Sequence, residues 1–152
     1  MVIRLMAEHD IPAVLEMGKA MHHESAYRDM VFSEDKCEKL LFYLLSDPQN
    51  NFAIVAVNDT GELAGMMAAS VTEHYFSDDK MVQDYLLYVR PEDRGGTIAS
   101  RIFAKFLEWV GKLEGMKFIQ CGITTEVDMQ KSIRLYEHFD FRVAGVMMRQ
   151  TS

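Results

Sequence analysis

The sequence has few of the features that mark secreted, membrane-embedded or nucleic-acid-binding proteins. Its two cysteines, Cys37 and Cys121, stand far apart and lack the paired spacing of a zinc site, so neither a disulfide framework nor a structural zinc ion is expected. No uninterrupted apolar run approaches the roughly 18 residues of a membrane span, and no secretory signal is recognisable. We therefore expect a cytoplasmic protein that does not bind membranes.

Positive charge is also scarce. The 16 Lys and Arg residues are outnumbered by 23 Asp and Glu residues, which gives a formal net charge of −7. Nucleic-acid backbones are held by clustered Lys and Arg, so this balance argues against a nucleic-acid partner and suits a cationic or amine substrate better. With 152 residues, of which 49% are hydrophobic, the chain is expected to form a single globular domain over residues 1–152.

The stretch from Asp84 to Trp109 organises the predicted fold. It begins with an apolar run at 85–89 that is typical of a buried strand. A turn rich in charged residues, proline and glycine follows at 90–96, and an amphipathic helix is expected from about Thr97. The apolar face of this helix must lie on a sheet.

The turn before that helix indicates a phosphate site. Gly95 and Gly96 allow the first amides of the helix to point at an anion, and Arg94 adds a fixed positive charge that suits a pyrophosphate. The spacing fits neither the triphosphate-binding loop nor the dinucleotide fingerprint. An ordinary tight turn that starts a helix is the alternative for the loop taken alone.

The remaining pattern predicts an α/β domain, more closely an α+β domain with a mixed sheet. Alternating apolar residues indicate the strands, capping residues indicate the helix ends, and turn residues separate the elements. Gly65 indicates a bulge or a close backbone approach within its strand. Besides the strand and helix described above, strands are expected at 2–5, 52–57, 62–76, 118–123 and 141–148, and helices from about Asp10, from Ser33 to Asp47, and from a capping box at Thr125 to Phe139.

Two segments resemble the GNAT family of acetyl-CoA-dependent N-acetyltransferases. Residues 94–99 (Arg-Gly-Gly-Thr-Ile-Ala) are similar to its acetyl-CoA loop, Arg/Gln-x-x-Gly-x-Gly/Ala, with Thr97 in place of the usual middle glycine. Residues 132–141 are similar to Ala-x-x-Leu-Tyr-Glu-x-x-Gly-Phe, with Asp140 in place of the glycine, and Met129 stands where the family often has Asn. The expected order, β-α-α-β-β-β-α-β-α-β, is the GNAT-like arrangement.

This resemblance implies a set of site residues and a co-substrate, acetyl-CoA, with no metal. The pantetheine arm would bind the backbone of Leu87, Tyr88 and Val89. Tyr136 would donate a proton to the departing thiolate of CoA. The pyrophosphate would bind the loop and helix start formed by Arg94, Gly95, Gly96, Thr97, Ile98 and Ala99.

The general base and the acceptor site are less defined by sequence. The family often has a carboxylate on the organising strand or its neighbour, which indicates Asp84 first and Glu73 second, while a water relay through Gln83 or a neutral His22 stays open. The acceptor amine is expected at the end of the first helix, where the candidates are His22, Glu24 and Tyr27. Adjacent helix residues do not share a face, so the polar cluster there is a poor metal site.

The sequence therefore predicts an enzyme, an N-acetyltransferase that transfers the acetyl group of acetyl-CoA to a primary amine by direct attack. The acceptor, a small molecule or a peptide amine, is not specified, and a homodimer stays open. Two alternatives remain at this stage. One is a non-catalytic acyl-CoA-binding sensor or interaction module on the same fold, and the other is an unrelated α/β protein that does not bind CoA.

Overall fold

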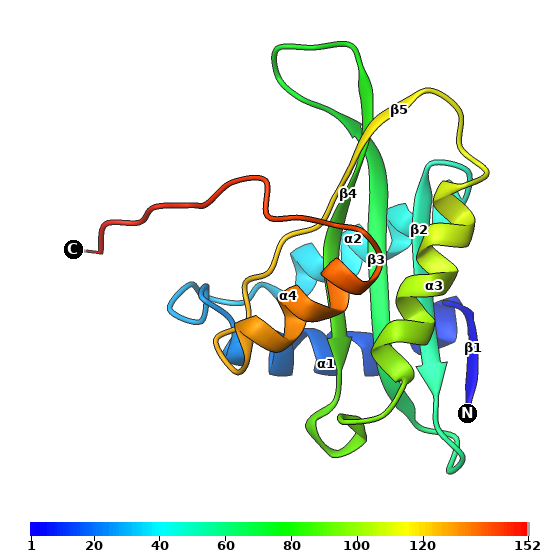
Figure 1. The fold of residues 1–152 in the computed structure, drawn as a ribbon. Helices are drawn as coiled ribbons and strands as arrows, with labels where there is room; N and C mark the ends of the chain where they lie inside the picture. The colour runs from blue at the N-terminus through cyan, green and yellow to red at the C-terminus, as the bar shows by residue number, and fades with distance from the viewer. Residues whose placement is uncertain (152) are drawn as a thin grey trace.

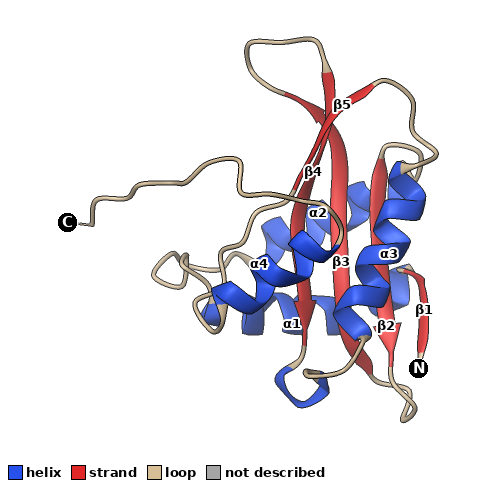
Figure 2. Ribbon diagram, viewed as in Figure 1, coloured by secondary structure: helices blue, strands red, loops and turns tan. Residues whose placement is uncertain are grey.

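The computed structural model describes residues 1–151, which form a five-stranded sheet with helices on both faces (Figures 1 and 2). The strand order is β1-β2-β3-β4-β5; neighbours are antiparallel except for the parallel pair β4 and β5. The strands are β1 (Val2–Leu5), β2 (Asn51–Val57), β3 (Leu63–Glu73), β4 (Lys80–Val89) and β5 (Met116–Gln120). The helices are η1 (Glu8–Asp10), α1 (Ile11–Glu24), α2 (Glu34–Ser46), η2 (Pro91–Asp93), α3 (Ile98–Val110) and α4 (Met129–His138).

The alternation of β2 divides the core between the two faces of the sheet. Ala53 and Val55 pack in a cluster with α1 and α2, whereas Phe52, Ile54 and Ala56 pack with α3 and α4. Successive strand residues point to opposite faces, so a strand covered on both sides reads as a continuous apolar run. The predicted mixed α+β fold is confirmed.

Several local predictions hold in the structure. Ser33 caps α2 by accepting a hydrogen bond from the Lys36 amide at 3.3 Å. Asp140 follows α4 with φ of 65°, the left-handed conformation for which the family usually has glycine. Gly65 lies in an irregularity between β2 and β3, and a Cβ added to it would come within 2.8 Å of the Tyr88 carbonyl oxygen. Glycine is therefore needed there for β3 to approach β4 closely.

The start of α4 differs from the prediction. The helix was expected to begin from a capping box at Thr125, but it begins at Met129. Asp128 is the cap, because its Oδ1 accepts a hydrogen bond from the Lys131 amide at 3.0 Å. Thr125 instead pairs with Ser25 in an isolated antiparallel bridge. The sequence pattern did not show that residues 122–127 form a separate loop between β5 and α4.

The prediction of a final strand at residues 141–148 is wrong. Residues 141–151 belong to no strand, and in Figure 1 this segment runs across the direction of β5 and then leaves the body. Its alternating apolar pattern resembles that of a strand, but a strand exists only where another strand pairs with it. The element order is otherwise confirmed from β1 to α4.

Candidate active site

The parallel strands β4 and β5 are paired only along the first part of β4 and then separate. Their pairing runs from Lys80↔Met116 to Gln83↔Gln120, and within residues 1–151 no pairing continues beyond that point. The second half of β4, including the predicted pantetheine-binding residues 87–89, is therefore paired only with β3. Its backbone on the β5 side is left available to a ligand.

Asp84 marks the point where the two strands separate. Its Oδ1 accepts hydrogen bonds from the Gly122 amide at 2.9 Å and from Gln83 Nε2 at 3.1 Å. The residue is only 8% exposed, and its Oδ2 is buried without a hydrogen-bond partner among the described residues. Burial raises the pKa of this carboxyl to about 6, although the two hydrogen bonds act in the opposite direction.

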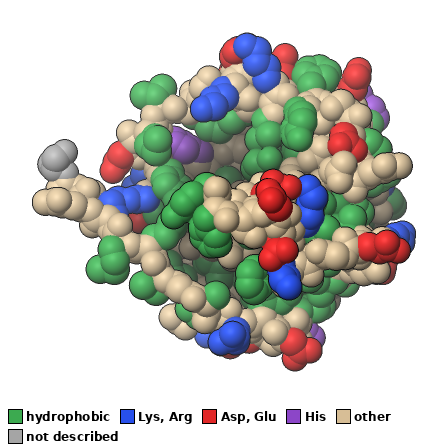
Figure 3. All heavy atoms as spheres, turned by 90° about the horizontal axis from the view of Figure 1, so that it is seen from above, with side chains coloured by type: hydrophobic (Ala, Val, Ile, Leu, Met, Phe, Trp, Pro, Cys, Tyr) green, Lys and Arg blue, Asp and Glu red, His purple; other side chains and the backbone are tan. Residues whose placement is uncertain are grey.

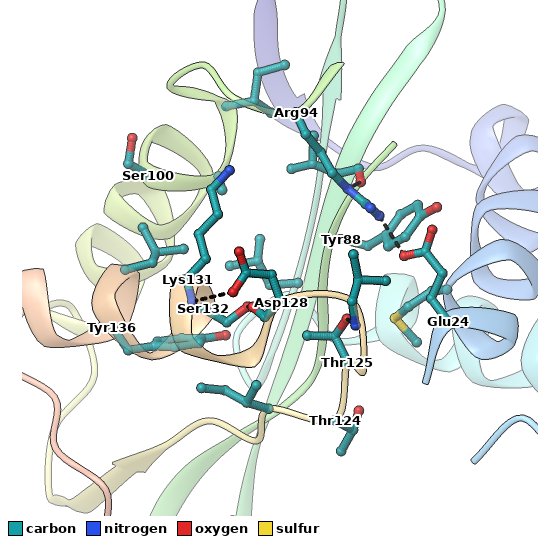
Figure 4. A pocket seen from close by; sticks show the side chains of 18 of the residues that line it. Glu24, Tyr88, Arg94, Ser100, Thr124, Thr125, Asp128, Lys131, Ser132 and Tyr136 are labelled. Atoms are coloured by element: carbon teal, nitrogen blue, oxygen red, sulfur yellow. Dashed lines mark hydrogen bonds and ion pairs between the residues drawn. The ribbon is translucent and has the colours of Figure 1, made fainter. Parts of the chain in front are cut away.

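A cavity of about 310 Å³ occupies the space that the parting strands leave. Its walls come from β4, the loop before α3, the first turn of α3, the loop after β5, α4 and the end of α1 (Figure 4). The lining includes Met21, Glu24, Ser25, Leu87, Tyr88, Val89, Arg94, Gly95, Gly96, Ile98, Ala99, Gly122, Thr124, Thr125, Asp128, Lys131, Ser132 and Tyr136. Tyr136 and five of the six predicted loop residues therefore line one cavity, whereas Thr97 is not part of its lining.

Backbone contacts close the cavity on the side of α1. The Ala26 amide donates to the Thr124 carbonyl at 2.8 Å, and the Glu126 amide donates to the Glu24 carbonyl at 3.0 Å. Arg28 adds an ion pair with Glu126. The end of α1 and the loop after β5 thus form one continuous wall.

The glycine loop leaves free space toward the cavity. Gly95 has a φ of +91°, which favours glycine, and a Cβ added to Gly95 or Gly96 would meet no atom within 4 Å. Helix α3 starts immediately after the loop, at Ile98, and the first amides of a helix have no acceptor within it. Thr97 supplies no side-chain cap. These amides are therefore available to an anion.

Arg94 is engaged within the protein. Its Nη2 donates to Glu24 Oε2 at 2.7 Å, its Nε donates to the Val89 carbonyl at 2.8 Å, and its guanidinium lies 5.4 Å from the centre of the Tyr88 ring. Figure 4 shows the side chain pointing toward Glu24 across one end of the cavity. An anion at the loop would compete with Glu24 for this guanidinium.

Tyr136 lies on the opposite side of the cavity from Glu24, with its hydroxyl pointing inward (Figure 4). Its ring packs edge-on against Phe103, with 4.9 Å between the ring centres, and the residue is 8% exposed. Burial, and then the nearby Asp84 carboxylate and Cys121, raise the pKa of the phenol well above its usual value. Tyr136 therefore keeps its proton at neutral pH.

The three residues expected to bind the acceptor are not brought together. His22 packs beside Phe32, with 5.6 Å between the ring centres, whereas Glu24 lines the cavity next to Arg94. Tyr27 lies beyond the end of α1 and contacts Arg149 of the C-terminal segment. Residues two apart on a helix point to different sides, so His22 and Glu24 cannot share one site.

The second base candidate lies far from the cavity lining. Glu73 ends β3 and pairs with Lys80 at 2.7 Å, at the start of β4, whereas the cavity is lined by the end of that strand. Gln83 binds Asp84 through Nε2 and accepts from Gln120 Nε2 at 2.8 Å, so it connects to the first candidate. Of the proposed carboxylates, Asp84 lies nearer, directly behind Gly122 in the cavity wall.

Sequence reasoning missed several polar residues of the cavity. Lys131, in the first turn of α4, extends along the cavity toward Ser100 of α3 (Figure 4). Thr124, Thr125 and Ser132 contribute hydroxyl groups. A usable signal existed, because ligand groups in sheets with parallel strands collect in the loops after the strands' carboxyl ends, and residues 122–132 follow β5. Among the described residues, no group of His, Cys, Asp and Glu could hold a metal ion.

Comparison with known proteins gives a family and a fold. The sequence model of the acetyltransferase (GNAT) family matches residues 18–141. No curated protein sequence matches the chain. Within residues 1–151, no helix is both long and apolar enough to cross a membrane.

Solved structures share the whole fold at low sequence identity. An aminoglycoside 6'-N-acetyltransferase from Acinetobacter haemolyticus matches with a TM-score of 0.73 and 16% identity, covering 100% of this chain and 98% of its own. Glucosamine-6-phosphate N-acetyltransferase from Arabidopsis thaliana matches with a TM-score of 0.72 and 12% identity, covering 99% and 97%. The protein BH1408 from Bacillus halodurans, as a mutant, matches with a TM-score of 0.74 and 14% identity, covering 100% and 99%.

Proposed function

We propose that this chain, which belongs to the acetyltransferase (GNAT) family, transfers the acetyl group of acetyl-CoA to a primary amine by direct attack of the amine on the thioester. One observation carries the proposal. The glycine loop and Tyr136 line opposite parts of a single cavity at the point where β4 and β5 part. Such a cavity can hold a long molecule with a phosphate at one end and a reactive group at the other.

The phosphate end is the loop at 94–99. Gly95 and Gly96 leave open space there, and the amides at the start of α3 can donate to the pyrophosphate oxygens. Lys131, on the facing wall, supplies a second positive charge near this end. From the loop, the pantetheine arm would follow the backbone of residues 87–89, which has no partner strand on that side.

The reacting end lies near Tyr136. The amine nitrogen forms a bond to the thioester carbonyl carbon, the carbon–sulfur bond breaks, and the thiolate takes the phenolic proton. A buried tyrosine is suited to this role because its raised pKa keeps the proton in place until the thiolate forms nearby. The ring contacts with Phe103 fix the direction of the hydroxyl.

The proton of the attacking amine needs an acceptor, and Asp84 is the proposed one. With its pKa near 6, the carboxyl is ionised at neutral pH and can take a proton. Its Oδ2 lacks a donor among residues 1–151, so this atom can accept one further hydrogen bond. Asp84 lies behind Gly122 in the wall, which favours transfer through a relay over direct contact with the amine.

The acceptor amine is proposed to be a small molecule or a peptide amine. Two of the structural neighbours are named for N-acetyl transfer to an aminoglycoside and to an amino sugar phosphate, and both are amines. The identity of these neighbours to this chain is too low to carry their substrates over. His22 and Tyr27 remain candidates for an acceptor surface outside the cavity, whereas the contact of Glu24 with Arg94 favours a place for Glu24 at the proposed phosphate end.

Two measurements test the proposal. Calorimetric titration of the purified chain with acetyl-CoA should show saturable binding at one site. A turnover assay over a panel of diamines, amino sugars, amino acids and lysine peptides, with release of free CoA thiol as the readout, should then find an amine that is acetylated. Absence of acetyl-CoA binding contradicts the whole proposal. Binding without turnover on any amine favours the alternative, a non-catalytic acyl-CoA sensor on the same fold.

A further inference from the structure

Three side chains form a hydrogen-bonded row across the point where β4 and β5 separate. Gln120 Nε2 donates to Gln83 Oε1 at 2.8 Å, and Gln83 Nε2 donates to Asp84 Oδ1 at 3.1 Å. Gln83 and Gln120 are the last paired residues of the two strands, so the row lies where the strands begin to part. It runs from an exposed amide at Gln120 to a carboxylate that is 8% exposed.

The side-chain amide of Gln83 can face Asp84 in two ways. In the structure its NH₂ group faces Asp84, where it donates to Oδ1 and, at 3.4 Å, approaches the Asp84 carbonyl. After a half-turn of the amide, its carbonyl oxygen would face Asp84 and could accept only from a protonated carboxyl. The two orientations have nearly the same shape, so the hydrogen-bond partners decide between them. The orientation of Gln83 therefore determines which protonation state of Asp84 is stabilised.

We propose that Gln120 is a positioning residue that acts through Gln83. By donating to the Gln83 carbonyl oxygen, it holds the Gln83 NH₂ group on Asp84 and keeps this carboxylate ionised. Asp84 Oδ1 then has two donors, and Oδ2 is left as the atom that can accept a further proton. The consequence for catalysis rests on the proposed function, in which Asp84 accepts the proton of the attacking amine.

The other groups around Asp84 do not compensate for its burial. Burial, and then the Asp84 carboxylate, raise the pKa of Cys121, which follows β5, and of Tyr136 on α4. Both groups are therefore uncharged at neutral pH. The Gly122 amide donates to Oδ1 at 2.9 Å, but its direction is fixed by the backbone. Gln83 is the donor that can turn away, so the row from Gln120 is the adjustable part of this environment.

Titration of the Asp84 carboxyl carbon by nuclear magnetic resonance tests the proposal without a turnover assay, with Asp84→Asn to assign the signal. Gln120→Met removes the donor, whereas Gln120→Glu can only accept and should turn the Gln83 NH₂ group toward residue 120. Both variants should raise the pKa of Asp84. We expect the ionisation constant to fall about threefold in Gln120→Met and about tenfold in Gln120→Glu, because a hydrogen bond to the charged form is lost in part or completely.

A matched background separates the hydrogen bonds from a through-space effect of charge. In Gln83→Met the connecting amide is absent, so neither substitution at Gln120 should change the titration of Asp84. A through-space effect would persist in this background and would weaken in salt. The added carboxylate is no unusual feature of the surface, because side chains of both charges are spread over the face seen in Figure 3.

The pH dependence of turnover gives a second readout. In Gln120→Glu the acidic limb should move to higher pH, while the Michaelis constant for acetyl-CoA stays nearly unchanged, because Gln120 does not line the cavity. If the titration moves and the acidic limb does not, Gln120 positions Asp84 as inferred and the base is another group. If no amine is acetylated, the proposed function fails, but the titration still decides the role of Gln120.

Two outcomes would overturn the proposal. The first is a titration of Asp84 that is the same in Gln120→Met, Gln120→Glu and the unchanged chain. The second is a shift of the same size with and without Gln83, because the effect would then not pass through its amide. Gln120 is exposed, so both variants should keep the melting temperature of the unchanged chain. If Gln120→Glu fails to fold, Gln120→Met gives the same test without an added charge.

Discussion

The Nη2 atom of Arg94 lies 2.7 Å from Oε2 of Glu24, so the arginine of the glycine loop is neutralised by the last residue of α1. Both side chains are partly buried at the proposed phosphate end of the cavity. A pyrophosphate there competes with Glu24 for the guanidinium. We predict that Glu24→Gln raises the affinity for acetyl-CoA by about 2- to 10-fold, the range expected from a partly exposed ion pair. Calorimetry measures the change.

A matched control separates this competition from a general change in charge. Glu92 lies two residues before Arg94 but contacts Arg90 at 3.5 Å, so Glu92→Gln removes the same charge without freeing Arg94. In an Arg94→Met background the effect of Glu24→Gln should disappear, since the two residues then no longer interact. If Glu24→Gln instead weakens binding, Glu24 positions Arg94 for the phosphate and does not compete with it.

Gly96→Glu is predicted to weaken acetyl-CoA binding strongly without unfolding the protein. A Cβ at Gly96 meets open space and the backbone needs no left-handed conformation there, so the fold should tolerate a side chain. A carboxylate about 5 Å from a phosphate charge costs about 3 kcal/mol at an effective dielectric constant near 20, or roughly a hundredfold in affinity. Gly96→Gln, which has the same size without the charge, should lose much less. Equal affinities for the Glu variant and the unchanged protein would show that the phosphate binds elsewhere.

Much of the fold was predictable because its signals are local. The cap at Ser33, the left-handed residue at Asp140 and the close approach at Gly65 each follow from the chemistry of one residue and its neighbours. The final strand was not predictable in this way. Alternation shows that residues 141–148 could form a strand, but it contains no information about whether a partner edge lies beside them.

In the candidate site, too, the residues predicted from local motifs differ from those that depend on the fold. The loop at 94–99 and Tyr136 were predicted from short motifs that carry their chemistry, and all of these residues except Thr97 line one cavity. The acceptor candidates came from composition alone, and the structure directs His22, Glu24 and Tyr27 to three different places. Lys131 was missed because its residue type and its place in a helix's first turn carry no motif, and the one signal, its position after the carboxyl end of β5, was not used. Only the fold brings it to the cavity.

The difference in stability between Asp84→Asn and the unchanged chain is predicted to shift in favour of the variant as the pH rises from acidic to neutral. Burial raises the folded-state pKa of Asp84 from 3.8 to about 6. The stabilising contribution of the protonated carboxyl is therefore complete below about pH 4 and is lost as the pH rises through about 6. The loss is roughly 3 kcal/mol at about 1.36 kcal/mol per pH unit. Asparagine keeps the acceptor for the Gly122 amide and does not ionise.

Urea unfolding of both proteins at pH 4 and pH 7 measures this difference. The free energy of unfolding of the variant, relative to that of the unchanged chain, should increase by roughly 3 kcal/mol between pH 4 and pH 7. A constant difference would mean that Asp84 is not ionised with an elevated pKa in the folded state.

The same substitution tests the proposed base. If Asp84 accepts the amine's proton, turnover should rise with pH through about 6, and this acidic limb should be absent in Asp84→Asn, with a lower plateau. Glu73→Gln is the comparison, because Glu73 pairs with Lys80 away from the cavity. An unaltered acidic limb in Asp84→Asn would transfer the role to another group, such as a relay through Gln83.

Tyr136→Phe separates a catalytic from a structural tyrosine. The ring packs edge-on against Phe103, and phenylalanine keeps that contact, so the melting temperature should change little. The hydroxyl points into the cavity (Figure 4). The open position favours a role toward a ligand.

The expected signature is a loss of turnover without a loss of binding. Acetyl-CoA affinity should stay nearly unchanged, because the loop at 94–99 supplies most of the charged contacts, while turnover should fall by roughly 10²- to 10⁴-fold, as is typical when a general acid is removed. The deficit should shrink with an acyl donor whose thiol is more acidic, because such a thiolate leaves without needing the phenolic proton. Unchanged turnover under conditions where chemistry limits the rate would show that Tyr136 is structural. A deficit that is equal for all donors would mean that its hydroxyl orients the thioester and does not protonate the leaving group.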